Sequence, residues 1–122
     1  MIRFEVKKRK RKYKNFLKLS EEQRLQYDMH LSIWIGDQQF FEEPDFPVLD
    51  FLYTVYKWKL SKDNEDFIYN CIETEDNPLI SFKREKNVWT ICSPWQLFEC
   101  KKKFTKDEIV NALDNLEKTI LM

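Results

Sequence analysis

The amino-acid sequence predicts an α+β protein with a largely antiparallel sheet of about 5–6 strands. Several short segments alternate apolar and polar residues, as half-buried strands do, and two longer segments repeat apolar residues every three to four positions, as amphipathic helices do. The composition supports a packed core, since 43% of the 122 residues are hydrophobic and 16% are aromatic. This length is close to the commonest domain size, so we expect a single domain over residues 1–122.

Alternation predicts strands in the N-terminal third of the chain. Residues 2–6 alternate apolar and polar side chains, and residues 27–35 do so over a longer stretch that places His30 on the polar face. A glycine and an aspartate then indicate a turn. Residues 39–42 are therefore expected to return as the second arm of a hairpin, which Pro44 ends.

The second half of the chain contains further strand patterns. Residues 67–73 alternate with both faces partly apolar, which is typical of a central strand. Residues 79–92 contain two apolar runs separated by a lysine and an asparagine, which predicts a second hairpin. Residues 95–100 fit either a short strand or an irregular aromatic segment, because their periodicity favours neither.

Two helices are predicted from a period of 3.6 residues. The first is a central helix over about 46–60, with Asp45 expected as its N-terminal cap. The second is a C-terminal helix over about 106–120, where Thr105 and Glu108 form the T-x-x-E pattern of a capping box. We expect both helices to pack against one side of the sheet.

Rare residue types exclude several kinds of site. Gly36 is the only glycine, so a glycine-rich phosphate-binding loop of the P-loop or Rossmann type is excluded. His30 is the only histidine, which excludes a multi-histidine metal site. Cys71, Cys92 and Cys100 lack CxxC spacing and are interpreted as buried free thiols. No apolar stretch approaches the roughly 18 residues of a membrane span, so we expect a cytoplasmic protein without membrane association.

The charge is balanced overall but unevenly distributed. Residues 1–30 contain ten Lys/Arg and four Asp/Glu, a net charge of +6. Residues 31–82 contain three Lys/Arg and eleven Asp/Glu, a net charge of −8. Residues 83–122 contain eight Lys/Arg and six Asp/Glu, a net charge of +2. This separation predicts an acidic middle and a basic N-terminal segment, each suited to a partner of opposite charge.

The acidic middle predicts a protein-binding surface. Acidic residues accompanied by aromatic side chains attract a basic protein and supply apolar anchors for it. Such a surface suits an inhibitor of a cationic nuclease, because blocking a phosphate-binding site requires negative charge. The candidate partner-binding residues are Trp34, Asp37, Glu42, Glu43, Asp45, Asp63, Glu65, Asp66, Glu75 and Asp76.

The alternative function is nucleic-acid binding through the basic N-terminal segment. Seven of the eight residues in 7–14 are Lys or Arg, a pattern expected of contacts to a phosphate backbone. The neutral net charge weighs against this alternative, since dedicated nucleic-acid-binding domains are usually basic. The candidate residues are Lys7, Lys8, Arg9, Lys10, Arg11, Lys12 and Lys14. The other interpretation of residues 7–14 is a solvated, mobile extension of the first strand.

Catalytic chemistry has little support in the sequence. Glu99 and Lys101 match the E-x-K half of a restriction-type nuclease motif, but a three-residue match arises easily by chance in this composition. A cleft that gathered Asp63, Glu73 or Glu75 beside Lys101 would indicate an enzyme. We therefore expect no enzyme, no cofactor and no metal site.

Three segments carry a resemblance to a known group of proteins. Residues 40–52 (FFEEPDFPVLDFL), 72–82 (IETEDNPLISF) and 93–100 (SPWQLFEC) resemble a family of uncharacterised small proteins from Bacillus-like bacteria. The likeness covers roughly residues 27–120. The chain is similar in type to the small, glycine-poor immunity proteins that neutralise polymorphic or contact-dependent toxins, an analogy that carries no site residue with it. It implies a non-catalytic inhibitor of a cognate toxin.

Overall fold

The computed structural model describes residues 1–7, 15–61 and 65–121. Its elements, in chain order, are β1 (Ile2–Lys7), the 3₁₀ helix η1 (Phe16–Lys18), α1 (Glu21–Arg24), β2 (Asp28–Ile35), β3 (Gln38–Pro47), α2 (Val48–Leu60), β4 (Phe67–Tyr69), β5 (Ile80–Glu85), β6 (Val88–Cys92) and α3 (Lys106–Leu121). The α+β class is confirmed, as are the central and the C-terminal helix. The six strands of the described residues form two antiparallel sheets, in the orders β1-β2-β3 and β4-β5-β6, rather than one sheet.

The first sheet contains a hairpin that is longer than the sequence indicates. β3 continues through Pro44 to Pro47, so the prediction that Pro44 ends this strand is wrong. The register between β2 and β3 shifts between the Met29–Phe46 and Leu31–Glu43 pairs, so two residues of β3 lie opposite one residue of β2. Proline is tolerated at such a bulge because no ladder hydrogen bond is required of its nitrogen.

The bulge also explains why the predicted helix cap is wrong. Asp45 lies within β3, and α2 begins at Val48 with Pro47 in the cap position and no side-chain cap hydrogen bond. At the C-terminal helix the predicted capping box is confirmed. The Thr105 N–H donates to Glu108 Oε1 at 3.1 Å, and the Glu108 N–H donates to Thr105 Oγ1 at 3.2 Å.

The second sheet is built around the predicted hairpin. β5 and β6 pair from Ser81–Cys92 to Glu85–Val88, and Lys86 adopts a φ of 57° in the turn. β4 is a three-residue strand at the edge, not a central strand, and Ile68 in its middle is exposed. The alternation over 67–73 is misleading because only Phe67 and Tyr69 among the strand residues face the core. Residues 95–100 are irregular.

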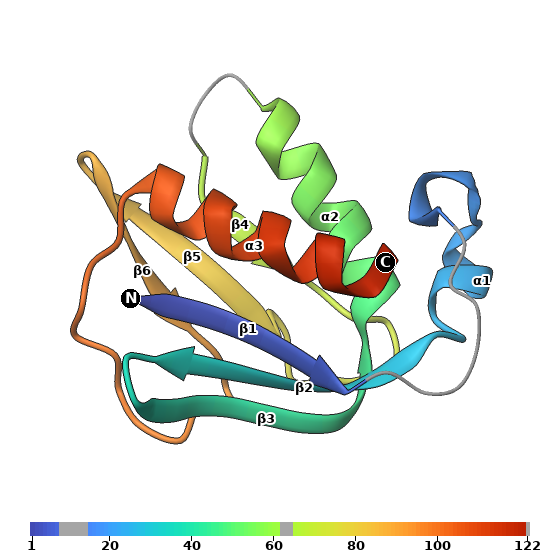
Figure 1. Cartoon of the computed structure of the whole chain (residues 1–122), viewed down its shortest axis with the longest axis horizontal. Coiled ribbons are helices and arrows are strands. Elements are labelled where there is room, and N and C mark those ends of the chain that lie inside the picture. The colour runs from blue at the N-terminus through green and yellow to red at the C-terminus, as the bar shows by residue number, and fades with distance from the viewer. Residues whose placement is uncertain (8–14, 62–64, 122) are drawn as a thin grey trace.

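Both helices lie on the same side of the sheets. Figure 1 shows α3 running above β1 and crossing in front of α2, while β1, β2 and β3 lie side by side below. Phe51 on α2 joins the two sheets, since its ring lies 6.2 Å from Phe4 of β1, 5.5 Å from Phe46 of β3 and 5.7 Å from Phe67 of β4. One continuous apolar core therefore serves both sheets.

A buried polar network ties the short helix α1 to this core. Arg24 donates from Nε to Asp50 Oδ1 at 3.0 Å, and the Tyr69 hydroxyl donates to Asp50 Oδ2, also at 3.0 Å. Arg24 also donates to the Leu19 carbonyl at 2.7 Å, and its guanidinium lies over the Tyr53 ring. Burial, together with the charge of Asp50, raises the pKa of Tyr69, so this hydroxyl remains a neutral donor.

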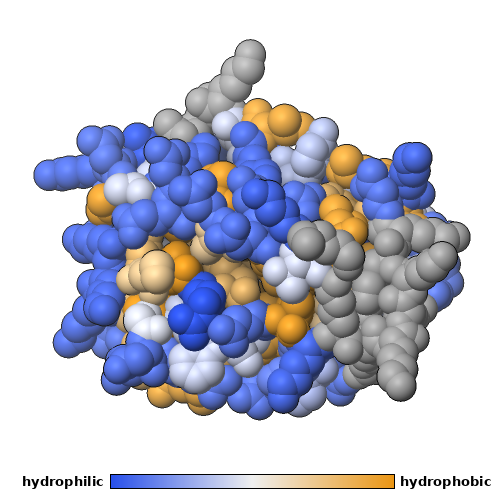
Figure 2. Space-filling model, in the orientation of Figure 1, coloured by the Kyte–Doolittle hydropathy of each residue, from blue (hydrophilic) through white to orange (hydrophobic). Residues whose placement is uncertain are grey.

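The surface is largely polar, and no helix in the described part of the chain is long and apolar enough to cross a membrane. Figure 2 shows one face covered mainly by hydrophilic side chains, with apolar atoms in separate patches. All three cysteines are free thiols. Cys71 and Cys100 are buried as expected, but Cys92 is exposed because the end of β6 directs it away from the core.

Candidate functional site

A small pocket at the end of β3 brings acidic and aromatic side chains together. It has a volume of about 140 Å³, and we call it the acidic pocket. Its walls come from β3, from the loop that follows β4 and from the segment after β6. The lining residues are Glu43, Asp45, Phe46, Pro47, Cys71, Glu73, Thr74, Leu79 and Trp95.

The loop after β4 is held in shape by one asparagine. The Asn77 side chain accepts a hydrogen bond from the Cys71 N–H at 2.9 Å and donates to the carbonyls of Cys71 and Thr74, at 2.9 and 2.8 Å. Asp76 donates its N–H to Thr74 Oγ1 at 3.1 Å. These bonds fold the chain back on itself and present Glu73 and Thr74 to the pocket.

An aromatic wall closes the pocket on another side. The Trp95 indole donates from Nε1 to Asp76 Oδ2 at 2.9 Å and stacks on Phe41 with a centroid distance of 6.3 Å and an interplanar angle of 15°. The neighbouring Leu97 N–H donates to the Phe40 carbonyl at 2.8 Å and joins this segment to β3. Trp95 is therefore held between β3 and the loop that contains Asp76.

The floor of the pocket is apolar and uncharged. Phe46, Leu79 and Cys71 are buried. Burial raises the pKa of the Cys71 thiol, which therefore remains protonated at neutral pH. The carboxylates lie around this floor: Asp45 and Glu73 are exposed and Glu43 is half-buried.

This arrangement fits an organic cation better than a metal ion. Glu43 Oε1 accepts a hydrogen bond from the Asp45 N–H at 3.1 Å, so one carboxylate is oriented by the backbone of the next acidic residue. No three His, Cys, Asp or Glu side chains among the described residues are grouped closely enough to hold a metal ion. A lysine or arginine side chain suits the pocket, since its aliphatic stem can lie on the apolar floor while its charge faces the carboxylates.

The predicted partner-binding residues are divided among several parts of the surface. Glu43 and Asp45 line the acidic pocket, Asp76 holds Trp95 in its wall, and Glu75 lies in the same loop. The residues at or beside the pocket thus come from two separate stretches of the acidic middle, residues 43–45 and 73–76.

Other predicted residues lie elsewhere. Trp34 and Glu42 belong to the outward face of the first sheet, where Glu42 accepts hydrogen bonds from His30 at 3.1 Å and Gln39 at 2.7 Å. Asp37 lies in the turn between β2 and β3. This face is polar, and Arg3 lies over the Trp34 ring.

A third group lies beyond the far end of α2. Glu65 and Asp66 are exposed there, and Asp66 accepts the Arg84 N–H at 2.7 Å. Asp63 lies outside the described residues, so its predicted role stays a prediction. The acidic middle of the sequence therefore does not lie wholly around one pocket.

Seven of the nine lining residues are not among the predicted partner-binding residues, and three of these seven carry polar groups or the aromatic wall. Glu73, Thr74 and Trp95 were missed because the alternation over 67–73 indicated a strand through Glu73, and nothing in the sequence joined residues 93–95 to β3. The one available signal was the pair of segments around Asn77 and Trp95 that carries the family resemblance.

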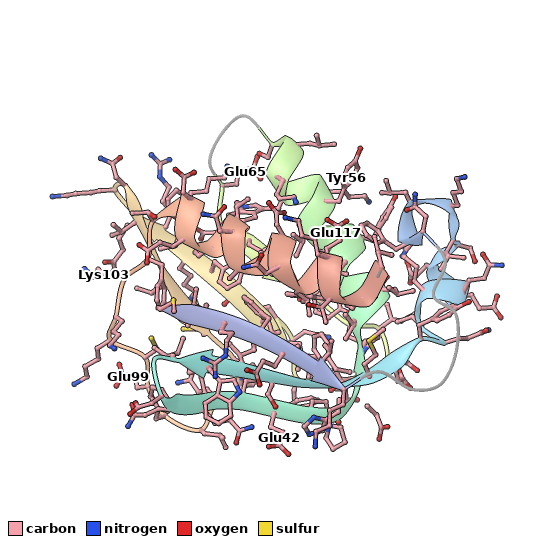
Figure 3. All side chains as sticks on the ribbon, in the orientation of Figure 1. Glu42, Tyr56, Glu65, Glu99, Lys103 and Glu117 are labelled. Atoms are coloured by element: carbon pink, nitrogen blue, oxygen red, sulfur yellow. The ribbon has the colours of Figure 1, made fainter. Side chains whose placement is uncertain are left out.

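The alternative sites are only partly described. Lys7 is exposed at the end of β1, while Lys8, Arg9, Lys10, Arg11, Lys12 and Lys14 lie outside the described residues, so the nucleic-acid interface stays a prediction. Glu99 and Lys101, the E-x-K pair, are both exposed. Figure 3 shows Glu99 at the opposite end of the molecule from the junction of β3 and α2, where the acidic pocket lies.

Comparison with known proteins gives a family but no function. No curated protein and no solved structure matches the chain. One family model, described as a domain of unknown function, matches residues 2–121 and thus nearly the whole chain. The chain therefore belongs to the DUF7878 family.

Proposed function

We propose that the protein is a non-catalytic binding protein that neutralises a cognate nuclease-type toxin by covering the active site of the toxin. The acidic pocket is the observation that carries this proposal. It combines three carboxylates from two segments of the chain with an apolar floor and a fixed indole. A basic protein partner would insert a lysine or arginine side chain there.

The charge of the pocket suits the proposed target. A nuclease binds the phosphate backbone of its substrate through lysine and arginine side chains. An inhibitor that accepts one of these side chains removes it from substrate binding and covers the surface around it. Complementary charge also accelerates the encounter between the two proteins, which matters when a toxin must be captured quickly.

The pocket also has the composition of an interface anchor. Binding energy in protein interfaces concentrates where a side chain enters a well-packed pocket that excludes water. The contact between Trp95 and Phe41 and the hydrogen bond to Asp76 hold the pocket open before a partner arrives. Pre-organisation of this kind lowers the entropy lost on binding.

A pull-down from the lysate of the protein's own host tests this proposal. The tagged protein is used with and without nuclease treatment of the lysate, beside a Glu43→Gln, Asp45→Asn, Glu73→Gln triple variant. A Glu21→Gln, Glu22→Gln, Asp107→Asn variant is the control, because it removes the same charge from exposed positions outside the pocket.

We expect the wild-type protein to capture a basic protein in stoichiometric amount, both with and without nuclease treatment. The control variant should capture the same protein, and the triple variant should not. Capture of nucleic acid instead, or equal retention by both variants, would refute the proposal.

A further inference from the structure

A second pocket lies on the face of the second sheet that points away from the helices. It has a volume of about 360 Å³, and we call it the serine pocket. Its floor comes from β5 and β6, and its rim comes from the loop before β5 and the segment after β6. Phe82 of β5 packs against Trp58 of α2, and side chains alternate along a strand, so Ser81 and Lys83 point to the opposite face.

Ser81 is a buried polar residue that points to this pocket. It is only 3% exposed, although it lies on the outer face of the sheet. Among the described residues the Ser81 hydroxyl has no hydrogen-bond partner. A buried hydroxyl without a partner is costly unless water or a ligand satisfies it. The Ser81 hydroxyl is therefore available to a ligand in the pocket.

Three other side chains bring hydrogen-bond donors to the serine pocket. Ser93 is 6% exposed and accepts the Trp95 N–H with its Oγ at 3.1 Å, so its own O–H remains to donate. Gln96 accepts the Ser93 N–H with Oε1 at 3.0 Å, which leaves its NH₂ group as a donor. The exposed ammonium group of Lys83 forms no ion pair with a described residue.

The charge of the serine pocket is positive. None of the described residues that line it carries a carboxylate. Glu85 lies two residues beyond Lys83 and binds Lys103 at 2.8 Å, while Asp76 accepts the Trp95 indole N–H. One unpaired cation and several free donors, without a lining carboxylate, favour an anionic ligand.

We propose that the serine pocket binds a small organic phosphate monoester, whose phosphate group is held by Lys83 and the hydroxyls of Ser81 and Ser93. A phosphate monoester carries about −1.5 to −2 charge and three acceptor oxygens, which match these donors better than the two oxygens of a carboxylate. Pro78 and Pro94 supply apolar surface for the organic part. The pocket is at the lower end of the roughly 300–1,000 Å³ range of small-molecule sites.

Titration of the ¹⁵N-labelled protein with phenyl phosphate, followed by NMR, tests the proposal. The backbone amides of Ser81, Lys83 and Gln96 should shift saturably, whereas phenol at the same concentration should leave them unmoved. Lys83→Gln should weaken binding by about ten-fold or more. Lys101→Gln is the matched control, because it removes the same charge from an exposed position outside the pocket and should bind like wild type.

Ser81→Ala separates a binding role from a structural one. This change removes a hydroxyl that has no partner among the described residues, so the free energy of unfolding should stay unchanged or rise. Binding of phenyl phosphate should nevertheless weaken by about ten-fold. A less stable variant that binds phenyl phosphate as tightly as wild type would assign the hydroxyl to the fold and overturn the proposal.

Cys92 gives a second readout, because its exposed thiol lines the same pocket and its strand position lies opposite Ser81. Bound phenyl phosphate should slow the reaction of this thiol with the neutral reagent iodoacetamide, and phenol should not. The proposal is overturned if phenyl phosphate at millimolar concentration neither shifts the pocket amides nor protects Cys92. Binding that Lys83→Gln and Ser81→Ala both leave intact overturns it as well.

This inference goes beyond the proposed function, since the serine pocket and the acidic pocket share no lining residue. The triple variant of the acidic pocket should bind phenyl phosphate like wild type. Failure of phosphate binding is therefore distinct from failure of the proposed toxin binding.

Discussion

Arg24 and Asp50 form an ion pair inside the protein, with Arg24 Nε 3.0 Å from Asp50 Oδ1 and the two residues only 7% and 8% exposed. The pair joins the short helix α1 to α2, and Tyr69 adds a hydrogen bond from β4. Removing one partner of such a pair leaves an uncompensated buried charge.

Asp50→Ala should therefore lower the free energy of unfolding by about 3–5 kcal/mol. Urea denaturation followed by circular dichroism measures this change. The control is Glu85→Ala, which removes an exposed partner of Lys103 and should lower the free energy of unfolding far less. A loss no larger for Asp50→Ala than for Glu85→Ala would show that the buried network does not stabilise the fold.

Phe51 is predicted to couple the two sheets energetically. Its ring contacts Phe4 and Phe46 of the first sheet and Phe67 and Tyr69 of the second. Phe51→Ala should cost about 3–5 kcal/mol, because a large cavity opens where four rings meet. Native-state hydrogen exchange should show reduced protection in both sheets, whereas loss confined to one sheet would mean that the sheets are independent.

The three cysteines are predicted to differ in reactivity. Cys92 is exposed, while Cys71 and Cys100 are buried, and burial raises the pKa of the Cys71 thiol. A thiol reagent such as DTNB should modify one cysteine quickly in the native protein and the other two only after unfolding. Cys92→Ser should abolish the fast phase; a fast phase that persists in this variant would contradict the assignment.

Two exposed carboxyl groups, those of Glu42 and Glu85, are predicted to have lowered pKa values, each for its own reason. Hydrogen bonds from His30 and Gln39 hold the pKa of Glu42 below its ordinary value of 4.5, and Lys103 does the same for Glu85. Because the folded-state pKa of each carboxyl group is below its ordinary value, its contacts stabilise the fold at a pH above the ordinary pKa. This stabilisation is lost as the pH falls through the lower, folded-state pKa.

Carboxyl NMR titration of two variants separates these causes. His30→Ala should raise the pKa of Glu42 and leave that of Glu85 unchanged, while Lys103→Ala should do the reverse. A variant that shifted both groups equally would point to general electrostatics rather than to the named hydrogen bonds.

The sequence predicts helices and strands correctly where the local pattern of apolar residues matches the face that packs against the core. The helix that ends at Leu60 and the capping box at Thr105 follow from patterns within a few residues, and both are present. The prediction at Pro44 is wrong because a strand tolerates a proline at a bulge. The bulge arises from the register between β2 and β3, which the sequence of β3 alone does not show. The division into two sheets likewise depends on which strands pair with one another, which no local pattern encodes.

The candidate site was predicted only in part for the same reason. Glu43 and Asp45 were recognised by charge, but their pocket exists because the Asn77 loop and Trp95 come from distant parts of the chain. Sequence spacing could not bring these segments together. Nor could it separate Glu43 and Asp45 from the equally acidic Glu65 and Asp66, which lie elsewhere.

The nuclease activity of the captured partner tests the central claim most directly. The partner is purified away from the protein, and its degradation of DNA and RNA is measured as the protein is added back. Stoichiometric wild-type protein and the Glu21→Gln, Glu22→Gln, Asp107→Asn control should abolish degradation, while the Glu43→Gln, Asp45→Asn, Glu73→Gln variant should leave it largely intact. A partner without nuclease activity, or inhibition that the pocket variant retains in full, would contradict the account.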